Sequence, residues 1–167
     1  MRTAYVGLGS NVGDRLGYLR RAVAELSSHS LVEFVAASSV YATDPVGPPQ
    51  PDYLNAVVEV RTSLQPLQLL ALCKSIEREV GRMSRGRWQQ REVDLDLLLV
   101  EGQTEQGAEL TLPHPEMQDR AFVLVPLSDL DPGLVLPSGS PILRRLEEIG
   151  RSGVKLAHPP ESLWPRP

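Results

Sequence analysis

The amino-acid sequence predicts an α/β (α+β) fold with a ferredoxin-like core, and the order of its segments supports this. Two segments have apolar residues at helical spacing, and they separate four strand-like segments at residues 3–8, 33–42, 53–62 and 93–100. The order strand-helix-strand-strand-helix-strand is the ferredoxin-like split motif. Right-handed crossovers would place both helices on one face of the sheet, so the other face must be covered by the rest of the chain or bind a ligand.

The first strand and helix follow from periodicity. Alternation in residues 3–8 puts Ala4, Val6 and Leu8 on one face. A glycine-containing turn over residues 9–13 leads to Asp14, which suits the N-cap position of a helix. The apolar stripe of that helix is Leu16, Leu19, Val23 and Leu26.

The second helix begins near Pro66, a residue favoured in the first turn, and Gly81 suits its C-cap. Its apolar stripe is Leu69, Leu72, Cys73, Ile76 and Val80. Residues 101–167 add loops, a short helix near 121–127 and a final helix near 141–149. We expect these additions to form a third layer, with a ligand cleft on the open face of the sheet.

The domain boundary is expected near the C-terminus. Residues 1–157 are predicted to form a single domain, and the proline-rich segment 158–167 is predicted to be a frayed tail.

Composition excludes several classes of protein. The 167 residues carry a net charge of −4, which argues against nucleic-acid or membrane binding through bulk charge. The sequence has no apolar run long enough to span a membrane and no secretory signal pattern. The lone Cys73 excludes an internal disulfide and a multi-cysteine zinc site. We therefore expect a soluble, cytoplasmic protein that binds neither nucleic acid nor a membrane.

Two aspartates on the last core strand are the sharpest chemical signal. Alternation places Asp94 and Asp96 side by side, opposite Val93, Leu95 and Leu97. Their repulsion and desolvation would be relieved by a bound cation, and such carboxylates suit Mg²⁺. The alternative is an edge strand whose acidic face is simply solvated.

An arginine-rich segment precedes these aspartates. Guanidinium groups match phosphate oxygens, so the cluster can hold a polyphosphate; the alternative is that the arginines simply form surface ion pairs. Trp88 lies in the middle of this polar segment, where it is either part of a lid that closes on substrate or an isolated anchor. The arginines are Arg82, Arg85, Arg87 and Arg91.

The third strand offers a surface for a flat ring. Tyr53 and Asn55 share the face opposite its apolar residues, so a heterocycle could stack on one and pair with the other. The alternative is an ordinary amphipathic strand start. Further along, His114 and Arg120 bracket an irregular stretch that ends at Phe122, and a lone histidine there is more often structural.

Two other patterns have simpler explanations. Lys74 and Glu77 form an i, i+3 surface pair by default. Gly7, Gly9 and Gly13 imitate a dinucleotide-binding fingerprint, but the third glycine is one place late and the following element order does not fit.

Several motifs in chain order resemble the 6-hydroxymethyl-7,8-dihydropterin pyrophosphokinases. The resemblance covers about residues 3 to 136. It is carried by Gly9-Ser-Asn11, Ser39-Val-Tyr-Ala-Thr43 with Pro45-Val-Gly47, Gln50-Pro-Asp-Tyr-Leu-Asn-Ala56, Glu77 with Gly81-Arg82, Arg91-x-x-Asp-Leu-Asp-Leu97, Leu112-Pro-His114 and Arg120-x-Phe122.

The resemblance implies a monomeric ferredoxin-like enzyme of folate biosynthesis. Such an enzyme moves the two terminal phosphates of ATP, as one unit, to the hydroxymethyl oxygen of the pterin and releases AMP. Two Mg²⁺ ions would be held by Asp94 and Asp96. The residues that match catalytic arginines are Arg82 and Arg91.

The resemblance also assigns the two substrate sites. Tyr53 and Phe122 match the aromatic pair around the pterin, and Trp88 matches the tryptophan of the closing loop. The residues that match its edge contacts are Thr43, Val46, Gly47 and Asn55. Those that match the ATP site are Lys74, Glu77, Arg85, Arg91, Leu97 (backbone), Thr111, His114 and Arg120.

The chain departs from the family pattern in a few places. Gln89 and Gln90 stand where the family usually has Gly-Pro, which bears on loop rigidity. Arg85 is assigned as the second loop arginine, with Arg87 as the alternative. Two rival functions remain open from the residues: a non-catalytic ligand-binding module, and a generic kinase that would release ADP in place of AMP.

Overall fold

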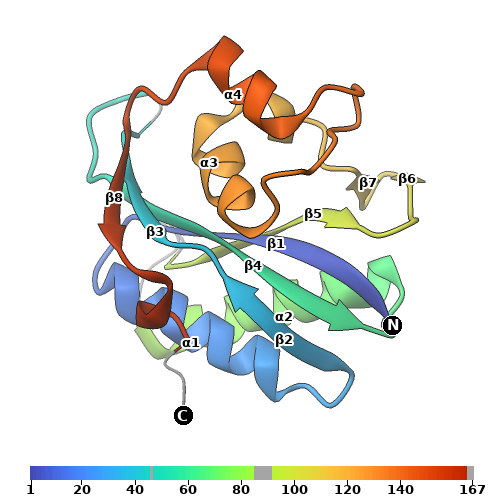
Figure 1. Cartoon of the computed structure of the whole chain (residues 1–167). Coiled ribbons are helices and arrows are strands. Elements are labelled where there is room, and N and C mark those ends of the chain that lie inside the picture. The colour runs from blue at the N-terminus through green and yellow to red at the C-terminus, as the bar shows by residue number, and fades with distance from the viewer. Residues whose placement is uncertain (46, 85–91, 165–167) are drawn as a thin grey trace.

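The computed structural model describes residues 1–45, 47–84 and 92–164, and the side chains of residues 82–84 lie outside that description. Helices lie on both faces of an antiparallel sheet, which gives the three predicted layers (Figure 1). One face carries α1 (Arg15–Ser28) and α2 (Pro66–Ser84), and the other carries α3 (Ala121–Leu130) and α4 (Ile142–Ile149).

The sheet has the strand order of a ferredoxin-like core. Strand β1 (Arg2–Ser10) lies between β5 (Asp94–Val100) and β4 (Tyr53–Thr62). The other edge of β4 pairs with β2 (Val32–Ala37) along one half and with β3 (Val40–Thr43) along the other. A small hairpin of β6 (Glu105–Gln106) and β7 (Thr111–Leu112) follows β5. The ferredoxin-like prediction is confirmed.

The first crossover forms as its sequence predicts. The carboxylate of Asp14 accepts a hydrogen bond of 3.1 Å from the backbone N–H of Gly17 and so caps α1. Leu19, Val23 and Leu26 are buried against the sheet. The buried residues of β1 meet them there, and they are Ala4, Val6 and Leu8.

The segment predicted as one strand over 33–42 is two strands, so that prediction is wrong in detail. The buried Ser38 separates them. Its N–H donates to the carbonyl of Val57, and its hydroxyl accepts from the N–H of Val57, each at 2.9 Å. Where the strand breaks, a side-chain oxygen therefore replaces a ladder carbonyl as the acceptor for the N–H of Val57.

Gly81 does not end the second helix, because α2 continues to Ser84. Gly81 is not among the glycines with positive φ. A Cβ at this position would lie 3.0 Å from Oε2 of Glu92, so the glycine allows close packing of the following segment. The predicted C-cap is therefore wrong.

The C-terminal segment packs on the body of the protein. Strand β8 (Val154–His158), which the sequence did not suggest, pairs with β3. After the short 3₁₀ helix Pro160–Ser162, Leu163 is buried and Trp164 stacks on Phe34 with ring centroids 4.3 Å apart. The prediction of a frayed end is wrong for residues 158–164.

Leu163→Ala is expected to lower the free energy of unfolding by about 2–5 kcal/mol, because it removes a buried side chain from the core. Leu163 is 2% exposed and belongs to the cluster between the sheet and the α1/α2 layer. Urea unfolding measures the effect. The control is Leu156→Ala on β8, which is 69% exposed and should change stability by less than about 0.5 kcal/mol. Equal effects of the two variants would contradict the packing of the C-terminal segment.

A second core lies on the other face of the sheet, under α3 and α4. Its members include Val57 of β4, Leu98 of β5 and Met117 of the 3₁₀ helix η1 (Met117–Asp119). Among the described residues, none of the helices combines the length and the apolarity that a membrane span requires.

Glu59 gives this face a pH-dependent contribution to stability. Glu59 lies opposite Tyr5 in the β1–β4 ladder, and burial, followed by the charge of Asp131, raises its pKa above the ordinary value of 4.5. A carboxyl with a raised folded pKa favours folding when protonated, so its contribution is present below pH 4.5 and is lost as the pH rises through the folded pKa.

Glu59→Gln is therefore expected to raise the thermal midpoint at pH 7, and the gain should disappear below about pH 4.5. Thermal unfolding across that pH range measures it. Glu33→Gln, at an exposed position on β2, is the control and should leave the thermal midpoint at pH 7 nearly unchanged. A gain that is the same at all pH values would contradict the assignment.

Candidate active site

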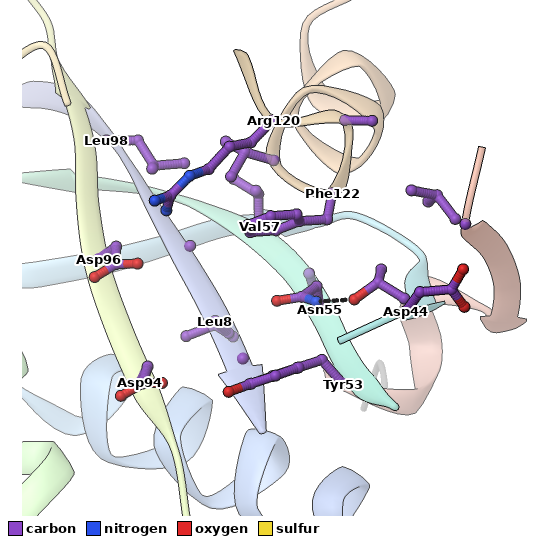
Figure 2. A pocket seen from close by; sticks show the side chains of 18 of the residues that line it. Leu8, Asp44, Tyr53, Asn55, Val57, Asp94, Asp96, Leu98, Arg120 and Phe122 are labelled. Carbon is purple, nitrogen blue, oxygen red and sulfur yellow. Dashed lines mark hydrogen bonds between the residues drawn. The ribbon is translucent and has the colours of Figure 1, made fainter. Parts of the chain in front are cut away.

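A cleft of about 610 Å³ opens on the face of the sheet that carries α3 (Figure 2). Its floor comes from β1, β4 and β5, one wall from the start of α3, and the opposite end from residues 43–44 and 152–154. The predicted open face of the sheet is therefore a cleft between the sheet and the C-terminal additions.

Asp94 and Asp96 stand together on the cleft face of β5, as alternation predicts. Leu95 and Leu97 between and beyond them are buried on the opposite face. In the β1–β5 ladder Asp94 lies opposite Gly9, and Asp96 lies opposite Gly7. No side chain of β1 therefore stands beside the two carboxylates.

The donor set of this pair fits Mg²⁺. Among the described residues there is no cluster of three or more histidine, cysteine, aspartate or glutamate side chains arranged to hold a metal. Two carboxylates leave the other coordination positions to water and to substrate phosphate oxygens, which is how Mg²⁺ is usually bound. The oxygen-only donors and the open floor are both compatible with that ion.

An aromatic and amide slot occupies the other end of the cleft. Figure 2 shows Tyr53 and Phe122 on opposite sides of Asn55. The side-chain nitrogen of Asn55 donates a 2.6 Å hydrogen bond to the hydroxyl oxygen of Thr43, and both side chains are buried. This contact fixes the amide, so its oxygen is presented in one orientation between two aromatic rings.

Two glycines of β1 form part of the floor. A Cβ on Gly9 would lie 2.9 Å from Oδ1 of Asn55, so only glycine leaves the amide in place. Gly7 packs beneath Leu98. The sequence argues against these glycines only as a dinucleotide-binding fingerprint. Gly7 and Gly9 are two residues apart, on the face opposite Val6 and Leu8, and this spacing indicates a strand face without side chains.

The C-terminal region contributes lining residues that the sequence did not suggest. The N–H of Asp44 donates to the carbonyl of Gly153 at 3.0 Å, and both residues line the cleft. Gly153 has a φ of 80°, and a Cβ there would lie 2.8 Å from the Asp44 carboxylate. Only the pairing of β3 with β8 brings these segments together, so no local pattern could reveal them.

Arg120 joins the two halves of the site. Its guanidinium carbon lies 5.6 Å from the centre of the Phe122 ring, and it pairs with Glu116. In Figure 2 its guanidinium points from the start of α3 toward β5. It thus lies between the aromatic slot and the carboxylate pair.

The other residues assigned to the ATP site that the structure describes lie outside the lining of the cleft. Glu77 pairs with Lys74 at 3.4 Å and accepts a 2.8 Å hydrogen bond from the N–H of Leu95, so it ties α2 to β5. The Leu97 side chain is in the core. Thr111 is exposed on β7, and the N–H of His114 donates to the carbonyl of Leu98. Their contact with a nucleotide stays a prediction.

Several predicted residues lie outside the described part of the chain. They are Val46, Arg85, Arg87, Trp88 and Arg91, together with the side chain of Arg82. Gly47 is described, is exposed with a φ of 94°, and does not line the cleft.

The lone Cys73 is buried, and burial raises its pKa to about 12, which makes it a poor nucleophile.

Comparisons with known proteins identify relatives of this chain. A family model described as 7,8-dihydro-6-hydroxymethylpterin-pyrophosphokinase (HPPK) matches residues 5–132. A 2-amino-4-hydroxy-6-hydroxymethyldihydropteridine pyrophosphokinase of Bacillus subtilis is 48% identical over 128 residues, covering 76% of this chain and 77% of the relative. A Haemophilus influenzae protein of the same name is 42% identical over 150 residues, covering 89% of this chain and 94% of the relative.

Solved structures share the fold. An HPPK-DHPS in complex with substrates superposes with a TM-score of 0.70 at 13% identity, covering 89% of this chain and 45% of that one. A Plasmodium falciparum HPPK-DHPS with SDX-DHP gives 0.72 at 15% identity, covering 93% and 48%. This chain therefore spans a little under half of those solved chains, and at such identities the likeness supports the fold alone.

Proposed function

Because the chain belongs to the 7,8-dihydro-6-hydroxymethylpterin-pyrophosphokinase family, and is thus an enzyme of folate biosynthesis, we propose that it acts on ATP and 6-hydroxymethyl-7,8-dihydropterin. The two terminal phosphates of ATP pass as one unit to the hydroxymethyl oxygen of the pterin, and AMP is released. The chain acts as a monomer on these two small molecules.

The pterin occupies the slot between Tyr53 and Phe122. Stacking on two rings suits a flat heterocycle, and the buried amide of Asn55 can accept from and donate to its edge. The hydroxyl of Thr43 holds that amide and adjoins the same edge. The slot therefore selects for ring shape and for the hydrogen-bonding pattern of the edge.

The polyphosphate of ATP lies toward β5. Asp94 and Asp96 would hold two Mg²⁺ ions, which neutralise phosphate charge and orient the transferred group when bound. Arg120 stands between this end and the ring slot, so it can contact phosphate oxygens or the departing AMP. The resemblance assigns Arg82 and Arg91 as catalytic arginines. It assigns Arg85 to the ATP site and Trp88 to the loop that closes over the substrates.

The remaining ATP contacts are proposed at the outer side of β5. Leu97 belongs to β5 itself. Lys74 and Glu77 of α2, Thr111 of β7 and His114 after β7 flank that strand. The rate of phosphoryl transfer depends mainly on how the substrates are positioned. These residues therefore bind and orient the nucleotide and take no part in bond making.

The observation that carries the proposal is that the carboxylate pair and the aromatic–amide slot open into one cleft. The test is to incubate the full chain with ATP and the pterin and to separate the nucleotides by chromatography. We expect AMP to form only when Mg²⁺ and the pterin are both present. Formation of ADP would indicate an ordinary kinase, and pterin binding without nucleotide turnover would indicate a binding module.

A further inference from the structure

Arg145 of α4 connects the C-terminal layer to the wall of the cleft. Its Nε donates to the carbonyl of Gln118 at 2.9 Å, and its Nη2 contacts Oδ1 of Asp119 at 2.7 Å. The remaining nitrogen, Nη1, contacts Glu148 of the same helix at 3.1 Å. The Arg145 side chain is 27% exposed, but the side chains of Asp119 and Glu148 are 70% and 52% exposed, so water screens both ion pairs and the bond to the Gln118 carbonyl is the better protected contact.

Outside α4, the residues that Arg145 contacts either line the cleft or directly precede residues that line it. Gln118 and Asp119 end the 3₁₀ helix, and Asp119, Arg120 and Phe122 line the cleft wall. This wall is also where α3 begins. Figure 1 shows α4 beside α3 on the side of the sheet that carries the cleft.

The start of α3 is also held by core packing, because Leu124 and Val125 are buried in the second core. No side chain caps the helix, whose N-cap residue is Arg120 itself. Met117 is fully buried in the second core and fixes the beginning of the turn. After Met117, the described side-chain contacts that hold the turn to the C-terminal region are those of Arg145 and the 3.1 Å bond from the N–H of Ser138 to Gln118.

We propose that Arg145 is a positioning residue that holds the Asp119–Phe122 segment at the distance from Tyr53 that a flat ring requires. It touches no substrate and acts through the segment that carries Phe122. The consequence for pterin binding rests on the function proposed above, whereas the restraint on the wall does not.

The chemistry of the guanidinium supports this role. Its nitrogens lie in one plane at fixed spacing, so one side chain can serve a backbone carbonyl and a carboxylate at the same time. A lysine at this position keeps the charge but places a single ammonium, which cannot reproduce the fork. Arg145→Lys is therefore expected to give intermediate behaviour.

Amide hydrogen exchange of the ligand-free full chain tests the restraint on the wall. The N–H groups of Val123 and Leu124 donate to the carbonyl of Arg120, so their exchange reports the order of this segment. In Arg145→Ala they should exchange about tenfold faster, because hydrogen bonds to a charged group are lost. Arg144→Ala, at the neighbouring exposed position on α4, should leave them unchanged. Unchanged exchange in both variants would overturn the proposal, as would full recovery in Arg145→Lys.

A double-mutant cycle on pterin binding tests the consequence. With Mg²⁺ and a non-hydrolysable ATP analogue present, Arg145→Ala should raise the Kd of the pterin about tenfold in the wild-type background and have little effect in Phe122→Ala. A merely structural role would give equal effects in both backgrounds and would overturn the proposal.

The two proposals can fail separately. If the wild-type protein binds no pterin while exchange at Val123 and Leu124 still responds to Arg145→Ala, the proposed function is wrong and the restraint stands. If the wild type binds the pterin and Arg145→Ala behaves like Arg144→Ala in both measurements, the positioning role is wrong and the proposed function stands.

Discussion

Asparagine in place of Asp96 is expected to lower the rate of AMP formation by about three orders of magnitude, and Asp94→Asn should have a similar effect. Both side chains project from β5 into the cleft, and asparagine keeps their shape while removing the charge. The loss of a charged oxygen ligand weakens the grip on Mg²⁺ and on the phosphates that it accompanies. Folding should survive, because neither side chain belongs to the hydrophobic cores.

The measurement is the rate of AMP formation as a function of Mg²⁺ concentration, together with thermal unfolding. Glu33→Gln removes an exposed carboxylate from β2, outside the cleft lining, and is the control. Near-normal rates in both aspartate variants would refute the proposed metal site. Lost activity that accompanies a lost thermal transition would show that the effect came from folding.

The second large effect is expected at the amide of the ring slot. Asn55→Leu should weaken pterin binding about 100-fold, because the heterocycle would lose its edge partner and leave its own polar groups unpaired. Leucine has the same number of side-chain heavy atoms and the same branching at Cγ, and a thermal unfolding control checks that the packing of β4 is kept. Calorimetric titration of the pterin in the presence of an ATP analogue measures the change.

The partner of this amide provides a matched pair of variants. Thr43→Val removes the oxygen that accepts from Asn55, so the amide loses its fixed orientation and pterin binding should weaken. Thr43→Ser keeps the oxygen and should bind nearly as well as the wild type. If valine and serine behave alike at this position, the Thr43–Asn55 hydrogen bond does not orient the amide.

Much of the fold follows from local patterns. Alternation in β1 and β5 identified which residues enter the core, and it placed Asp94 and Asp96 on one face. The helical stripe after Asp14 and the cap itself also formed as predicted. These features depend on periods of two and 3.6 residues, which the sequence carries explicitly.

What the sequence could not reveal depends on distant contacts. The break at Ser38 exists because its hydroxyl bonds Val57 across the ladder. Strand β8 has only five residues and is mostly exposed, so its pairing with β3 is what defines it. The part played by Asp44 in the cleft depends on that same pairing.

Prediction of the site was similarly divided. Among the predicted residues that the structure describes, those that line the cleft are Thr43, Tyr53, Asn55, Asp94, Asp96, Arg120 and Phe122. Gly7 and Gly9, which form part of the cleft floor, were noticed in the sequence, but only as an imitation of a dinucleotide-binding fingerprint. The support from Arg145 was not predictable, because it joins α4 to a turn that shares no pattern with it.

The buried Leu163 has a consequence for synthesis on the ribosome. This leucine belongs to the same core as the first strand, and Trp164 covers Phe34. A nascent chain that has emerged only as far as α4 therefore has a gap in that core and an unpaired edge on β3. Such intermediates expose apolar surface, so co-translational folding stays incomplete until residue 164 has left the exit tunnel.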